Sequence, residues 1–148
     1  MRIAIAADHN GVALKQILSA RLAGQGHEVD DRGSFGDETV DYPPLCADLG
    51  RLVTTGAVDR AIMIGGTGGG ELIALNRLPG VRAGLGFTLL STRISRAHND
   101  SNVLVLGTKL VTDEIAEELT DLWLATPFKG GRHRDRLDQI EALERGEL

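Results

Sequence analysis

The stretch RAIMIGGTGGGE at residues 60–71 joins an apolar run to a glycine-rich turn that ends in a carboxylate. The run at residues 61–64 predicts a buried strand, and Glu71 falls near the start of the helix that follows. Because the turn is almost bare of side chains, several of its amide groups can converge on an anion. A carboxylate beside such a cradle suits proton abstraction next to a carbonyl group.

Short apolar runs alternate with helical patterns along the rest of the chain. Strands are predicted at residues 2–7, 27–32, 61–64, 81–86 and 102–106. Helices are predicted at residues 12–22, 43–53, 71–76, 89–98, 112–125 and 132–145. This alternation indicates an α/β fold with a parallel sheet covered by helices on both faces. The last helix carries few apolar residues, so we expect it to pack on the outside or on a partner chain.

Length and composition favour one globular domain spanning residues 1–148. The net charge of -5 argues against a general nucleic-acid or anionic-membrane surface. Aromatic residues make up only 3% of the chain, which argues against stacking on nucleic-acid bases. Any phosphate group must therefore be held by a local cluster of cations.

The single cysteine, Cys46, rules out an intrachain disulfide and is expected to be a small core residue. The first residues reach Asp8 too soon for a signal peptide. No apolar run approaches the ~20 residues of a membrane span, so the sequence predicts a cytoplasmic protein. The lone thiol and the scattered histidines show no metal-ligand spacing, so no metal is expected.

Polar residues follow several predicted strands at the points where the strands end. Asp8 and His9 follow the first strand, the glycine turn follows the third, and Lys109 follows the fifth. His98 and Asn99 end the helix before the fifth strand. Ligands of open parallel sheets bind beyond the carboxyl ends of the strands, so we expect all of these residues to gather at that edge.

Each of these features also has a plain structural reading. The glycine turn lacks the Gly-Lys-Ser/Thr of a P-loop and the spacing of the dinucleotide fingerprint, but it could be a simple tight turn. Asp8 could be a helix N-cap with His9 on the surface. His98 and Asn99 could simply end a helix.

Two arginines near the carboxyl terminus form a candidate phosphate clamp. Arg132 and Arg136 are four residues apart and so share one face of a predicted helix. Arginine forks fit phosphate oxygens, although a run of basic residues is often only a solvated face. Tyr42, the one tyrosine, lies at a predicted helix entry, where a packing role is the plain alternative.

Taken together, these segments resemble the ribose-5-phosphate isomerase B family, which also contains galactose-6-phosphate isomerase subunits. The matching segments run in order along nearly the whole chain, and only the full set is specific. They are Ala7-Asp8-His9 with Gly11, Asp41-Tyr42-Pro43, Gly66-Thr67-Gly68-Gly69-Gly70-Glu71, Ala74 with Asn76, Gly80-Val81-Arg82-Ala83, Arg96-Ala97-His98-Asn99-Asp100, Asn102-Val103-Leu104, and Arg132-His133 with Arg136.

The resemblance implies a Rossmann-like three-layer sandwich whose five-stranded parallel sheet has helices on both faces, with a C-terminal exchange or packing helix. It implies an aldose–ketose isomerase of the pentose phosphate pathway that interconverts ribose 5-phosphate and ribulose 5-phosphate through a cis-enediolate. No metal or organic cofactor is expected. The implied partners are the phosphosugar and further copies of the chain, in a homodimer or homotetramer with active sites at the subunit interface.

The resemblance also implies catalytic roles for single residues. Glu71 stands where one branch of the family holds its base, whereas the other branch uses a cysteine at the position of Gly65. We therefore expect the glutamate branch, with Glu71 moving a proton between C2 and C1. His98 and Asp8 are expected to assist opening of the furanose ring, with Thr67 near the same oxygens.

The remaining residues of the implied site are expected to bind the substrate. The phosphate group is assigned to four cationic residues: His9, Lys109, Arg132 and Arg136. The enediolate and the sugar hydroxyls are assigned to loop amides and two polar side chains: Gly66, Gly68, Gly70, Asn99 and Tyr42.

Three departures from the family pattern leave the sugar open. Lys109 stands where an arginine is common, Asn10 where a small apolar residue is usual, and residues 86–88 lack a polar residue often found there. A tetrose or hexose phosphate is therefore an alternative substrate, and a non-catalytic phosphate- or nucleotide-binding module is an alternative function. Glu71, His98 and Asp8 together argue against that module, because a passive anion site gains nothing from a carboxylate.

Overall fold

A five-stranded sheet in the order β2-β1-β3-β5-β4 organises the computed structural model, which describes residues 1–148. Every neighbouring pair of strands is parallel. The strands are β1 (Arg2–Ala7), β2 (Glu28–Asp31), β3 (Arg60–Gly65), β4 (Ala83–Gly86) and β5 (Val103–Gly107). The helices are α1 (Val12–Gly24), α2 (Tyr42–Thr54), α3 (Gly69–Leu75), α4 (Leu89–Ala97), α5 (Asp113–Ala125) and α6 (Arg132–Glu144).

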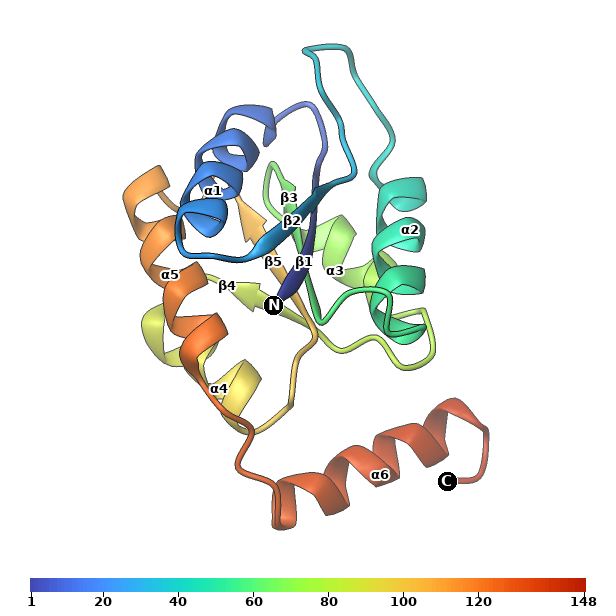
Figure 1. Ribbon diagram of the computed structural model, residues 1–148. Helices are drawn as coiled ribbons and strands as arrows, with labels where there is room; N and C mark the ends of the chain where they lie inside the picture. Colours follow the sequence, from blue (N-terminus) through green and yellow to red (C-terminus); the bar gives the residue numbers. More distant parts are fainter.

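The central strands β1, β3 and β5 are apolar along their length because helices cover both of their faces. One face packs against α1 and α5 through Leu18, Leu22 and Trp123, all fully buried. The opposite face packs against α2 and α3 through Leu49 and Leu75. Figure 1 shows these helices on the two sides of the sheet. The predicted three-layer α/β architecture is therefore confirmed.

Two helices extend this arrangement. α4 packs on β4 and beside α5, whereas α6 lies outside the layers, below the sheet in Figure 1. α6 buries Leu137 but leaves Ile140 and Leu143 exposed. The expectation that the last helix packs on the outside is thus confirmed. No helix has both the length and the apolar character needed to cross a membrane.

The topology brings three strand ends to the same level. Register pairs Ala7 of β1 with Ile64 of β3, and Gly65 of β3 with Gly107 of β5. The side of the sheet where these strands end is called the carboxyl edge. The opposite side, where β3, β4 and β5 begin, is called the amino edge. In the sheet, β1 has β2 as its neighbour on one side and β3 as its neighbour on the other, so the strand order reverses after β2. Ligands of open parallel sheets bind beyond the carboxyl edge at such a reversal of strand order, which here lies between β1 and β3.

Candidate active site

Two nearly buried carboxylates lie at the carboxyl edge, beside the reversal of strand order. Glu71, on the first turn of α3, is 4% exposed, and Asp8, directly after β1, is 5% exposed. Glu71 can fold back onto the end of β3 because Gly65 has no side chain there. A Cβ at residue 65 would lie only 1.8 Å from Glu71 Oε1. The bare end of β3 therefore fixes where the carboxylate lies.

The surroundings of Glu71 make it a stronger base than an exposed carboxylate. Burial raises the pKa of Glu71 above its ordinary value, and the negative charge of Asp8 raises it further. A carboxyl group whose pKa is raised in this way is a stronger base when ionised, which suits general base catalysis. Its position and its basicity thus agree with proton abstraction.

A loop of free amide groups follows β3 at the same edge of the sheet. The N–H groups of Gly66, Thr67 and Gly68 donate no hydrogen bond inside the chain, while Gly69 N–H donates to Thr67 Oγ1 at 3.4 Å. Gly68 has a φ of 78°, a left-handed conformation that turns the loop into α3 and favours glycine. Unpaired amides of this kind are suited to stabilise charge that develops on an oxygen.

Other predicted site residues surround the loop. A Cβ built on Gly66 would meet Asn10 Nδ2 at 3.4 Å and Lys109 Cε at 3.5 Å, so both side chains flank the loop. The Tyr42 hydroxyl packs directly against Gly70, and Val40 N–H donates to His9 Nδ1 at 3.5 Å. The carboxyl edge therefore brings together nine of the predicted residues: Asp8, His9, Tyr42, Gly66, Thr67, Gly68, Gly70, Glu71 and Lys109.

The other predicted residues form a basic cluster at the amino edge. His98 follows the last turn of α4 and stacks on His133 of α6, with ring centroids 4.0 Å apart and planes 12° apart. Partial burial lowers the pKa of His98, as do the neighbouring charges of His133, Lys129 and Arg136. The sequence assigned Asn99, Arg132 and Arg136 to the substrate, and they belong to these same two segments, at the end of α4 and on α6.

The expectation that His98 and Asn99 join the strand-end residues is therefore wrong within one chain. A helix that follows a strand of a parallel sheet runs back to the opposite edge, so its last residues lie where the next strand begins. β3 spans six residues, so the two edges are about 17–20 Å apart at ~3.3 Å per residue. A five-carbon sugar phosphate, with bonds of ~1.5 Å, cannot bridge that gap.

One residue that holds the basic cluster together was not identified from the sequence. Asp100 pairs with Arg96 at 2.8 Å, Arg82 at 3.1 Å and Arg134 at 3.6 Å, and so ties the end of α4 to α6. Its positive φ of 46° is uncommon for a residue other than glycine. The sequence alone placed Asp100 only at the end of a predicted helix, and gave no sign of its arginine partners.

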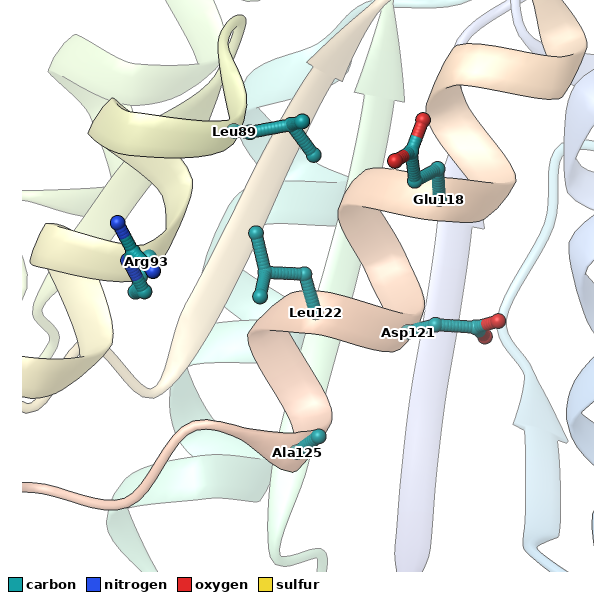
Figure 2. Close-up of a pocket in the computed structure, with 6 residues that line it drawn as sticks. All are labelled: Leu89, Arg93, Glu118, Asp121, Leu122 and Ala125. Carbon is teal, nitrogen blue, oxygen red and sulfur yellow. The ribbon is translucent and has the colours of Figure 1, made fainter.

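Five hollows on the surface of the single chain are lined by residues other than Glu71. One of them has a volume of about 550 Å³. Figure 2 shows it between α4 and α5, lined by Leu89, Arg93, Glu118, Leu122 and others. It is open and shares no residue with either half of the predicted site. This hollow is therefore not the candidate active site.

Comparison with known proteins agrees with this geometry. Residues 3–140 match the model of the ribose/galactose isomerase family. The chain belongs to that family. Ribose-5-phosphate isomerase B of Escherichia coli (strain K12) is 41% identical over 143 residues, which cover 97% of this chain and 96% of the relative. The resemblance stated from the sequence is thus confirmed.

Solved structures of ribose/galactose isomerases share the whole fold. Ribose-5-phosphate isomerase B of Clostridium thermocellum has a TM-score of 0.97 at 40% identity, covering 100% of both chains. The enzyme of Mycoplasma genitalium, solved with bound ribulose-5-phosphate, has a TM-score of 0.93 at 36% identity. That match covers 97% of this chain and 96% of the relative.

Cys46 lies close to Glu71 but is not placed to act as the base of this isomerase. It is 1% exposed, and its Sγ lies 3.9 Å from the Glu71 carbonyl oxygen. Burial and the charge of Glu71 raise the pKa of the Cys46 thiol to about 12. A thiolate is the reactive form, so this thiol is inert at neutral pH.

We therefore expect iodoacetamide at pH 7.5 to leave turnover unchanged while the protein is folded. The measurement is residual activity over time, with mass spectrometry to count alkylated thiols before and after denaturation. Loss of activity in step with alkylation of Cys46 would contradict the assignment of Glu71 as the base.

Proposed function

We propose that this protein is an aldose–ketose isomerase that interconverts ribose 5-phosphate and ribulose 5-phosphate through a cis-enediolate. The observation that carries the proposal is the buried Glu71 carboxylate beside the unpaired amides of residues 66–68. Family membership supports the reaction class, and the ribulose-5-phosphate complex of the Mycoplasma genitalium relative supports the pentose. We place the reaction in the cytoplasm and in one domain, residues 1–148.

Opening of the furanose ring is the first step that we propose. Asp8 takes the proton of the C1 hydroxyl while His98 donates a proton to the ring oxygen, with Thr67 beside these oxygens. The lowered pKa of His98 makes its imidazolium form a stronger acid, which suits donation to the ring oxygen and leaves a neutral imidazole behind. The product is an open aldehyde whose C2 proton is acidic.

Proton transfer between the two carbons is the second step. Glu71 removes the C2 proton and returns it to C1, while negative charge collects on the enediolate oxygens. The O2 hydroxyl proton passes to O1 as the carbonyl group moves from C1 to C2. The amides of residues 66–70 and the side chains of Asn99 and Tyr42 bind those oxygens and the hydroxyls. Loss of one such donor typically costs about 3–4 kcal/mol of barrier.

The separation of the two edges supports a site that is shared between two chains. We propose a homodimer in which the carboxyl edge of one protomer faces the amino edge of its partner, alone or within a tetramer. His9 and Lys109 of one chain then share the phosphate with Arg132 and Arg136 of the other. The rings of His98 and His133, stacked at 4.0 Å, form a preformed surface for this contact.

The proposal is tested by turnover of ribose 5-phosphate beside a tetrose 4-phosphate and a hexose 6-phosphate, without added metal or nucleotide. We expect the highest kcat/KM for the pentose. A higher value for another sugar would keep the chemistry and replace the substrate. A folded protein that turns over none of them would instead support the phosphate-binding module.

A further inference from the structure

Asp8 depends on a single residue for its hydrogen bonds. The backbone N–H of Asn10 donates to Asp8 Oδ1 at 2.8 Å, and Asn10 Nδ2 donates to Asp8 Oδ2 at 3.0 Å. No other group of the chain donates to this carboxylate, and no cation pairs with it, although the residue is only 5% exposed. A nearly buried carboxylate is thus held entirely by its neighbour two residues along the chain.

The two bonds to Asp8 have different origins. The backbone bond closes a local turn that any residue other than proline at position 10 would preserve. The second bond comes from the amide side chain and exists only because residue 10 is asparagine. Because both oxygens accept a hydrogen bond, rotation of the carboxylate about its Cβ–Cγ bond breaks at least one of them.

The Asn10 amide also lies where ring opening would take place. Nδ2 is 3.4 Å from His9 Nε2 and 3.4 Å from the position that a Cβ on Gly66 would occupy. It therefore sits between the carboxylate, a predicted phosphate ligand and the loop of free amides. Asn10 itself is exposed, so its side chain is not part of the packed core.

We propose that Asn10 is a positioning residue for the ring-opening step: its side-chain amide orients the Asp8 carboxylate toward the C1 hydroxyl of the cyclic aldose. The inference rests on the proposed function, in which Asp8 acts in that step. It predicts that Asn10 contributes to the turnover of the furanose and not to the later proton transfer by Glu71.

The chemistry of the two sugars separates these steps. The furanose of ribose 5-phosphate must open before C2 can lose its proton. In ribulose 5-phosphate the hydroxyl that would close a five-membered ring carries the phosphate, so the ketose stays open. Exchange of its C1 proton with solvent deuterium therefore requires the base but no ring opening.

The experiment compares wild type with Asn10→Ala, which keeps the backbone bond, and with Asn10→Asp, which keeps the shape but loses the donor. Loss of a hydrogen bond to a charged group predicts a fall in kcat for ribose 5-phosphate of about tenfold. Because ring opening then limits the rate, the primary isotope effect with 2-deuterated ribose 5-phosphate is expected to shrink toward one. Deuterium exchange at C1 of ribulose 5-phosphate is expected to stay within about twofold of wild type.

Three results would overturn the inference. Unchanged kcat in both variants would mean that the amide does not orient Asp8. A parallel loss of forward turnover and of C1 exchange would place Asn10 in the proton transfer, and a rise in KM alone would make it a direct sugar ligand. Failure of the proposed function is separate, because wild type would then show neither turnover nor exchange. Thermal unfolding of each variant checks that the fold is retained.

Discussion

Replacement of Glu71 by glutamine is expected to lower kcat for ribose 5-phosphate by about 10²–10⁴-fold, the usual contribution of a general base. Glutamine has nearly the same shape, so it can occupy the space above Gly65 without disturbing the loop. It cannot accept a proton at neutral pH, so C1 exchange on ribulose 5-phosphate should be lost as well. KM should change little, because the groups that bind phosphate are untouched. Initial rates and proton exchange measured by NMR test both expectations.

Glu118→Gln is a suitable control for this substitution. Glu118 is exposed on α5 and lies outside both halves of the site, so the same chemical change there should leave kcat unaltered. If the Glu71→Gln variant keeps more than about a tenth of wild-type kcat, Glu71 is not the general base.

The pH profile of the wild type should report the same carboxylate. Glu71 must be ionised to accept the C2 proton, so activity is lost as the pH falls through its pKa. Because burial raises that pKa, the acid limb of kcat should lie above the ~4.3 of an ordinary glutamate. In the Glu71→Gln variant this limb should be absent from the residual activity.

A mixture of two inactive variants is expected to regain activity. Glu71→Gln damages the carboxyl edge, and His98→Ala damages the amino edge. In a mixed dimer, one site carries both substitutions. The other site pairs the unchanged carboxyl edge of the His98→Ala chain with the unchanged amino edge of the Glu71→Gln chain. Because half of the dimers are mixed after random exchange of subunits, about one quarter of all sites should be active. Co-expression, or joint refolding of the two variants, followed by an assay of ribose 5-phosphate turnover tests this.

The matched control combines two variants of the same edge. Glu71→Gln and Asp8→Ala both lie at the carboxyl edge, so every site in their mixed dimer keeps one lesion. No gain above the separate variants is expected from this pair. Equal recovery in both mixtures, or recovery in neither, would contradict a site shared between two chains.

The sequence was most informative where the pattern of the backbone determines position. The alternation of strands and helices predicted the parallel sheet, and the ends of its strands brought Asp8 and Glu71 to one edge of that sheet. Boundaries moved by two residues at most. β4, for example, begins at Ala83 instead of Val81, because the Arg82 N–H donates to the Asn102 side chain instead of joining the ladder.

The rest of the site depends on contacts that no periodicity encodes. His98 was placed at the wrong edge because the end of a helix was treated like the end of a strand. The three arginine contacts of Asp100 and the amide that Asn10 offers to Asp8 arise from side-chain geometry between segments or within one turn. Both residues were visible in the sequence, but nothing there distinguished a surface residue from one that orients its neighbours.

The bare Cα of Gly65 also limits how such a site can evolve. A Cβ at residue 65 would lie 1.8 Å from the Glu71 carboxylate, so any side chain there, a cysteine included, displaces Glu71 from its place. A thiolate at residue 65 and a carboxylate folded back from residue 71 thus compete for one volume. The two kinds of base expected in this family are then mutually exclusive solutions. When a cysteine replaces Gly65 in a protein that uses the glutamate base, the new side chain displaces the Glu71 carboxylate at the same substitution.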